Sequence, residues 1–162
     1  MGVDQPWRRF GGVEQTQILL NSYRDWLGAE LIPRRDNMEE EAMALYTAPF
    51  VVVAHGVGVD PLLTYGNQVA LKLWEMDPET LVKTPSRLTA EPGLQEERAK
   101  FMQQTARDGF ARGYTGIRIS RSGKRFRNID ATVWNLHEPQ GNYVGQAAKF
   151  ARWEWLSETL CS

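Results

Sequence analysis

Cysteine is nearly absent from this sequence. Cys161, beside the C-terminus, is the only one among 162 residues. A single cysteine forms neither an intramolecular disulfide nor a cysteine-based zinc cluster, so stabilisation by either kind of cross-link is excluded. A chain of this length with 42% hydrophobic residues buries enough apolar surface to fold without them. We therefore expect one globular domain in a reducing compartment, the cytoplasm.

An excess of charge of one sign is also lacking. The chain has 19 Lys and Arg against 20 Asp and Glu, for a formal net charge of -1. Nucleic-acid binding relies on neutralising phosphates and therefore usually requires a basic face. We expect no nucleic-acid partner, and we interpret the one local group of basic residues as a solvated hairpin. These residues are Arg118, Arg121, Lys124, Arg125 and Arg127.

Long hydrophobic runs and the common catalytic motifs are missing as well. No apolar stretch approaches the roughly 18 residues of a membrane helix, and residues 1–12 lack the apolar core of a signal peptide. The two histidines, His55 and His137, lie beside turns without any spacing typical of metal ligands. Neither a nucleophile elbow nor a phosphate loop occurs. We expect neither membrane insertion, nor a metal site, nor an enzyme of a familiar class.

The N-terminal part of the chain is helical in pattern. Apolar residues recur at helical spacing between Ile18 and Leu27. Asn37 is placed to cap a second helix, with Glu40 as its capping-box partner. The apolar stripe of the first helix predicts a homodimer formed through the N-terminal helices.

From residue 50 onward the pattern becomes that of a sheet with intervening helices. Residues 50–54 form a continuous β-branched run, typical of a strand covered on both faces. Asn67 is suited to cap a helix, and Asp77 with Pro78 to open another. The remaining predicted elements are a strand over 62–65, a helix over 94–111, strands over 116–120, 124–136 and 143–151, and a short helix over 153–162.

Three runs carry a resemblance to a known family. They are DPLLTYGNQ at 60–68, PSRLTAEP at 85–92 and YTGIRISRSGKRFRNIDATVWNL at 114–136, continued by GQAA at 145–148. These runs resemble the MEKHLA domain family, which is described as PAS-like, and the likeness extends from about residue 19 to 155. The family occurs alone in bacteria and at the end of certain plant homeodomain proteins, and this chain is similar to the stand-alone form. The resemblance implies a sensory or regulatory role in signal transduction.

The element order and the resemblance together predict an α+β fold. We expect a PAS-like five-stranded antiparallel sheet with helices on one face and the N-terminal helices on the other. The expected division of the chain is a flexible lead-in over 1–12, an N-terminal helical extension over 13–47, the PAS-like domain over 48–156 and a tail over 157–162.

A second resemblance concerns the flavin-binding, light-sensing branch of PAS domains. The hairpin over 122–128 is similar to that branch, where Asn128 matches a flavin-contacting asparagine and Arg87 an arginine near the flavin phosphate. Ser86, however, stands where the photoreactive cysteine belongs, and Ala90 where a glutamine belongs. Haem-binding PAS domains hold iron through a histidine on the long helix, and residues 94–111 contain none. We expect neither flavin nor haem, and the sequence identifies no other cofactor.

Two arrangements of the sheet faces remain open. Simple alternation places the apolar set of the last three strands inward, whereas the hairpin resemblance places Asn128, Asp130 and Thr132 inward. We favour a sheet covered on both sides, whose polar set lines a small pocket; an internal polar network that binds nothing is the alternative. The apolar set is Ile117, Ile119, Ile129, Ala131, Val133, Val144 and Phe150, and the other set is Arg118, Ser120, Asn128, Asp130, Thr132 and Trp134.

The functional hypothesis is a non-enzymatic sensory module that binds a small molecule or a protein partner. One alternative is a small cone-shaped α+β enzyme that uses Asp130 as a buried general base, and another is a scaffold that only binds proteins. The expected ligand contacts are Arg87, Arg118, Asn128, Asp130, Thr132 and Trp134.

Overall fold

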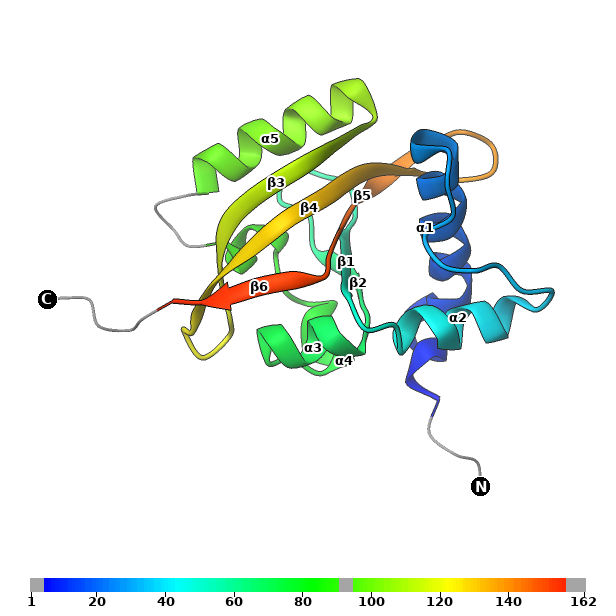
Figure 1. Cartoon of the computed structure of the whole chain (residues 1–162), viewed down its shortest axis with the longest axis horizontal. Helices are drawn as coiled ribbons and strands as arrows, with labels where there is room; N and C mark the ends of the chain where they lie inside the picture. The colour runs from blue at the N-terminus through cyan, green and yellow to red at the C-terminus, as the bar shows by residue number, and fades with distance from the viewer. Residues whose placement is uncertain (1–4, 91–94, 157–162) are drawn as a thin grey trace, which may run out of the picture.

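The strands of this protein form one antiparallel sheet. The computed structural model describes residues 5–90 and 95–156, without the side chains of 95, 97 and 98. The strand order is β2-β1-β5-β4-β3, and β6 pairs with the first part of β4 (Figure 1). The strands are β1 (Val51–His55), β2 (Leu63–Gly66), β3 (Phe110–Ile119), β4 (Arg125–His137), β5 (Tyr143–Phe150) and β6 (Arg152–Trp155).

Helices cover both faces of the sheet, which confirms the predicted α+β architecture. On one face α1 packs through Leu19, Leu20 and Tyr23 against the sheet residues Trp134 and Leu136. On the other face lie α3, α4, η2 and α5. The helices are η1 (Pro6–Gly11), α1 (Gly12–Leu27), α2 (Met38–Tyr46), α3 (Gln68–Trp74), α4 (Pro78–Leu81), η2 (Ser86–Thr89) and α5 (Gln95–Asp108).

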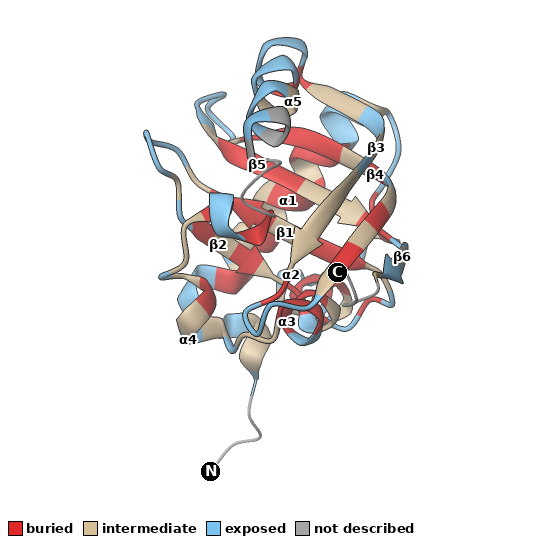
Figure 2. Ribbon diagram, turned by 90° about the vertical axis from the view of Figure 1, so that its left-hand side faces the viewer, coloured by how far each residue is buried: buried red, intermediate tan, exposed pale blue. Residues whose placement is uncertain are grey.

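Strand β1 lies at the centre of this two-sided packing. Val52 and Ala54 belong to the apolar cluster under α1, while Val51 packs with Ala70 and Trp74 of α3. Its unbroken apolar run therefore reflects burial on both faces, as predicted. Figure 2 shows the same contrast between the buried central strands and α5, which is exposed along much of its length.

The apolar stripe of α1 is used within the chain. Leu19 and Leu20 are fully buried against the sheet, and Tyr23 meets Trp134 edge-on with ring centroids 5.0 Å apart. The apolar stripe from which we predict a homodimer is therefore buried against the sheet of the same chain. Among the helices of residues 5–90 and 95–156, none combines the length and the apolar character needed to cross a bilayer.

The long helix ends earlier than its sequence pattern indicates. Helix α5 stops at Asp108, and β3 begins at Phe110 rather than at residue 116. Gly109 has φ +98°, and a Cβ there would lie 2.4 Å from the Trp26 ring. A glycine is required by both the backbone angle and this close approach. The contact comes from α1, far away in sequence, and local helical spacing therefore does not reveal it. The predicted start at residue 94 lies outside the described residues.

The segment after β5 is a strand, so the predicted helix over 153–162 is wrong for its described part. Strand β6 continues β5 in the same register along β4, since Thr132 pairs with Lys149 and Ile129 with Arg152. Pairing with β4 supplies the backbone hydrogen bonds that a helix would otherwise have to form. Residues 157–162 lie outside the described residues, as do residues 1–4 of the predicted lead-in; residues 6–11 form η1.

A bulge in β4 decides between the two predicted arrangements of side chains on the sheet faces, since each arrangement holds for one half of the strand. Asp130 has φ +55°, and the β3–β4 register shifts between Tyr114 and Gly116. The extra residue reverses the alternation, so Asn128 before the bulge and Ala131 after it lie on the same face, toward α3 and α5. The first half of β4 therefore follows the arrangement from the hairpin resemblance, and the second half follows simple apolar alternation.

One buried amide ties three elements together. Asn67 is fully buried; its Oδ1 accepts from the N–H groups of Val52 and Ala70, at 3.1 and 3.2 Å. Its Nδ2 donates to the carbonyl oxygens of Leu45 and Phe50, at 3.2 and 2.8 Å. The predicted N-cap of α3 thus also anchors β1 and the end of α2.

A second buried group joins α1 to α2. The Glu41 carboxylate accepts from Arg34 Nε at 2.8 Å, from the Arg35 N–H at 2.9 Å and from Gln17 Nε2 at 2.8 Å. Burial by itself raises the pKa of Glu41. The hydrogen bonds from Arg34, the Arg35 backbone and Gln17 outweigh this effect and lower the pKa from 4.5 to about 2.

We expect Asn67→Ala to lower the free energy of unfolding by about 3 kcal/mol, because it leaves buried N–H and C=O groups without partners. Asn37→Ala removes the exposed N-cap of α2, whose Oδ1 accepts from the Glu40 N–H, and should cost about 1 kcal/mol. Urea unfolding of both variants measures the difference. Equal losses would contradict the anchoring role of Asn67.

The positive φ of the exposed Asp130 at the bulge predicts how substitutions there change stability. Asp130→Gly should change the free energy of unfolding by less than about 0.5 kcal/mol, since glycine tolerates a positive φ. Asp130→Val should cost about 2 kcal/mol, because a β-branched residue does not. Thermal unfolding of the two variants distinguishes them, and the prediction fails if they are equally stable.

The Glu41 site predicts a pH dependence. Because the folded pKa lies below the unfolded value, its stabilisation is present above about pH 5 and is lost as the pH falls toward 2. Glu41→Gln should cost about 2 kcal/mol at neutral pH, less than for a fully buried pair because Arg34 is 25% exposed. Urea unfolding between pH 6 and pH 3 should show the two proteins converging. A constant difference would contradict the assignment.

Candidate functional site

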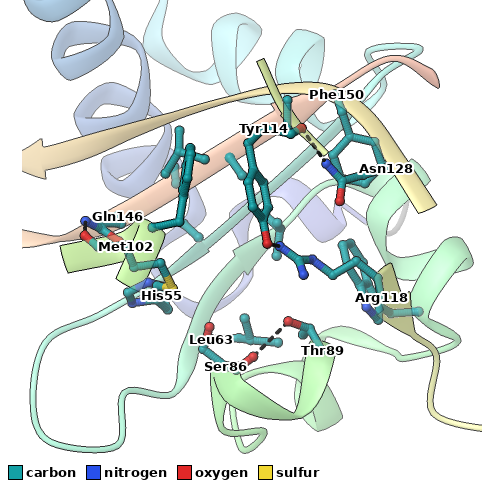
Figure 3. A pocket seen from close by; sticks show the side chains of 18 residues that line it. His55, Leu63, Ser86, Thr89, Met102, Tyr114, Arg118, Asn128, Gln146 and Phe150 are labelled. Atoms are coloured by element: carbon teal, nitrogen blue, oxygen red, sulfur yellow. Dashed lines mark hydrogen bonds between the residues drawn. The ribbon is translucent and has the colours of Figure 1, made fainter. Parts of the chain in front are cut away.

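A pocket lies between the sheet and the layer formed by α3, η2 and α5. Its volume is about 50 Å³, enough for a few small-molecule atoms or several waters. Strands β1, β3, β4 and β5 form its floor, and α5 covers it through Phe101 and Met102 (Figure 3). The polar lining residues are His55, Ser86, Thr89, Tyr114, Arg118, Asn128 and Gln146.

Asn128 is held by the strand beside it. Its Oδ1 accepts from the Gly116 N–H at 3.2 Å, and its Nδ2 donates to the Tyr114 carbonyl at 3.1 Å. These bonds bridge the site where the β3–β4 register shifts. The amide of Asn128 thus replaces backbone pairing at the bulge, which gives this predicted site residue a structural role in the pocket wall.

Arg118 directs its guanidinium into the pocket (Figure 3). Its Nη2 donates to the Tyr114 hydroxyl at 3.0 Å and its Nη1 to the Ile117 carbonyl at 3.3 Å. The guanidinium carbon lies 5.1 Å from the centroid of the Tyr114 ring. Tyr114 in turn packs against Phe101 of α5, with centroids 4.2 Å apart. Both hydrogen-bond partners of this cation are neutral.

Gln146 places a buried amide on the opposite side of the pocket. Its Nε2 donates to the Met102 carbonyl at 2.8 Å and to Asn135 Oδ1 at 3.1 Å. Both neighbours are acceptors, since Asn135 Nδ2 donates to the Ala106 carbonyl, and the orientation of the Gln146 amide is therefore fixed. Its Oε1 is buried and has no hydrogen-bond partner among the described residues.

His55 and the η2 segment complete the polar lining. His55 is buried at the end of β1, and its Nδ1 lies 2.9 Å from the Gly56 carbonyl. A carbonyl oxygen only accepts, which assigns a proton to Nδ1. Ser86 and Thr89 are also buried, and Thr89 donates to the Ser86 carbonyl at 2.8 Å.

The structure brings together two of the six residues predicted as ligand contacts, Arg118 and Asn128. Arg87 is exposed and pairs with Asp60 at 3.1 Å, although its neighbour Ser86 lines the pocket. Trp134 is buried on the opposite face of the sheet, under α1. The bulge accounts for the separation, because it reverses the alternation after Asn128.

The two other predicted contacts, Asp130 and Thr132, are not among the residues that line the pocket. Asp130 is exposed, and its backbone N–H donates to the Thr115 hydroxyl at 3.2 Å. The enzyme hypothesis requires a buried carboxylate, and Asp130 at this position does not provide one.

Sequence reasoning missed His55, Tyr114 and Gln146 as pocket residues. One signal was available for Gln146, a polar residue in the middle of an otherwise apolar strand. No such signal was available for Tyr114. The β3–β4 pairing is irregular on both sides of this residue, so alternation along the strand does not predict which face of the sheet its side chain lies on.

The electrostatics of the pocket are one-sided. None of its described lining residues is acidic, and Arg118 contributes a permanent positive charge. Within residues 5–90 and 95–156, no ion pair joins Arg118 to a carboxylate, and no cluster of three His, Cys, Asp or Glu residues is arranged to hold a metal ion. The site therefore favours a neutral or anionic occupant.

Comparisons with known proteins agree with this architecture. The family model of the MEKHLA domain matches residues 13–155. No curated protein matches the chain.

Solved structures share the fold at low sequence identity. A light-oxygen-voltage domain studied with a flavin analogue has TM-score 0.56 and 18% identity over 74% of this chain and 86% of its own. A PAS domain from Colwellia psychrerythraea has TM-score 0.59 and 13% identity over 69% and 92%. An RNA-binding light-oxygen-voltage receptor has TM-score 0.60 and 15% identity over 75% of this chain but 34% of its own.

At these identities the structural likeness establishes the fold, while the family model covers most of the chain. This protein belongs to the MEKHLA domain family and has a PAS-like fold.

Proposed function

We propose that this domain is a non-enzymatic sensory module that binds a small molecule in the pocket between the sheet and α5. The observation that carries the proposal is the buried Gln146 Oε1, which has no hydrogen-bond partner among the described residues. A buried acceptor without a partner costs about 1–3 kcal/mol. A ligand N–H or O–H in the pocket would remove this cost.

Hydrogen bonds from the pocket wall extend to other elements, as a sensory role requires. Gln146 bonds to Asn135, and the Asn135 N–H donates to the Gly109 carbonyl at the end of α5, at 2.8 Å. The Asn135 carbonyl accepts from Trp26 Nε1 of α1 at 3.0 Å. An occupant that changes the position of Gln146 would therefore act on α5 and α1 through one residue.

A flavin would be a different occupant, and two of the three solved structures described above are light-oxygen-voltage proteins. In this chain Ser86 occupies a buried place in the pocket where the light-sensor resemblance requires a cysteine. Ser86 excludes a cysteinyl adduct, and a cavity of about 50 Å³ is much smaller than a flavin ring system. We therefore propose a colourless ligand. Cytoplasmic location, the absence of a nucleic-acid partner and a homodimer through the N-terminal helices also remain proposals from the sequence, although such a dimer would have to use side chains other than the buried Leu19, Leu20 and Tyr23.

Protein binding is a second candidate function, favoured by one surface feature. Val57, Val59 and Leu62 are exposed on the loop between β1 and β2, and Leu88 is exposed on η2. Leu62 bridges to Pro85, which places this loop beside η2. Exposed apolar side chains gathered in this way are typical of contact surfaces. The loop adjoins the pocket wall through His55 and Ser86.

The small-molecule proposal predicts the effect of filling the pocket. Ala148 lines the pocket on β5, and Ala148→Leu should reduce ligand capture at least about tenfold, because the added side chain occupies ligand volume. The control is Ala151→Leu, at an exposed position outside the pocket. Native mass spectrometry after incubation with a cell metabolite extract, with an absorbance scan, measures the bound mass.

Wild type and Ala151→Leu should retain the same small mass, without visible colour. A clean apo mass for wild type would overturn small-molecule binding and favour the protein-binding candidate. Equal retention by Ala148→Leu would place the ligand elsewhere.

A further inference from the structure

The position of Arg118 bears on the chemistry of the ligand. Its guanidinium extends into the pocket, and its hydrogen bonds go to a hydroxyl and a backbone carbonyl. The positive charge is half-buried and lacks a carboxylate partner within residues 5–90 and 95–156. A partly desolvated charge without a counter-ion is unfavourable, and an anionic ligand group would compensate it.

Tyr114 provides a second donor at the same place. Its hydroxyl oxygen accepts from Arg118 Nη2, which leaves its own O–H proton available for donation. The guanidinium is held against the Tyr114 ring, and that ring is held against Phe101 of α5. Two donors are thus fixed side by side in the pocket, one of them charged.

The remainder of the pocket limits the kind of anion. Its wall is largely apolar and includes Phe150, Val133 and Ala131, with Gln146 Oε1 as an acceptor on the far side (Figure 3). A doubly charged phosphate is strongly hydrated and needs several cationic or N–H donors. A carboxylate carries a single charge, matches a guanidinium with two parallel oxygens and brings an apolar body with it.

We propose that the ligand is a short-chain carboxylic acid with a small aliphatic body, whose carboxylate is bound by Arg118 and the Tyr114 hydroxyl. A hydroxyl or amino group at the other end of the molecule donates to Gln146 Oε1. This assignment rests on the proposed small-molecule function and specifies the ligand class for the same pocket.

The test is isothermal titration of the full chain with a set of small acids and their matched amides. The acids are acetate, propionate, butyrate and 4-hydroxybutyrate, and inorganic phosphate is titrated beside them. We expect at least one acid to bind and its amide to bind at least about tenfold weaker, since the amide lacks the charge. Equal binding of acid and amide, tighter binding of phosphate, or no binding of any acid would overturn the assignment.

Variants locate the interaction. Arg118→Gln should weaken the acid at least about tenfold while leaving the amide unchanged, and Tyr114→Phe should weaken it by a smaller factor. The matched control is Arg127→Gln, on the same hairpin, where Arg127 pairs with the exposed Glu154 at 3.0 Å outside the pocket. Acid binding that survives Arg118→Gln would also overturn the assignment. The comparison of acid with amide on wild type needs no variant and stands even if a substitution impairs folding.

The two proposals fail separately. If mass spectrometry detects a neutral metabolite in the pocket while the acids do not bind, the carboxylate assignment is wrong and the sensory function stands. If neither the acids nor any metabolite binds, both are wrong.

Discussion

Side chains of strand β4 pack against the helices on both faces of the sheet, and the bulge at Asp130 decides which residues lie on which face. A regular strand places alternate residues on opposite faces throughout its length. With φ +55° at Asp130, the alternation reverses midway, so Phe126 and Asn128 share a face with Ala131 and Val133. Trp134 and Leu136 are then directed to the opposite face, where they form the core under α1.

The pocket is a consequence of this reversal. Asn128 lies at the irregular point of the β3–β4 ladder and bonds to the backbone of β3, so its amide stabilises the wall. Further polar groups of the pocket come from the neighbouring strands, Arg118 and Tyr114 on β3 and Gln146 on β5. Helix α5 covers them and is linked back to the sheet through Gln146 and Asn135.

The N-terminal helices are integral to the fold. Helix α1 supplies Leu19, Leu20 and Tyr23 to the core on one face of the sheet, and Trp26 contacts Gly109 and donates a hydrogen bond to β4. Asn67 fixes the end of α2 to β1 and α3, while Glu41 joins α2 to α1. The family match begins at residue 13 and so includes these helices. A change at the pocket can therefore reach the outer surface of the protein through packed elements and buried hydrogen bonds.

The sequence by itself determined the family, the α+β class, the strand covered on both faces, and the caps Asn37, Asn67 and Asp77. These features depend on residues close together in the chain, where spacing and capping chemistry act directly. The end of α5 at Gly109, the strand β6 and the face of each β4 residue depend on partners distant in sequence. Arg118 and Asn128 were predicted for the pocket, but Asp130, Thr132 and Trp134 were assigned by an alternation that the bulge interrupts. Only the tertiary pairing of β3 with β4 decided which side chains meet, because a single residue with positive φ reverses every face that follows it.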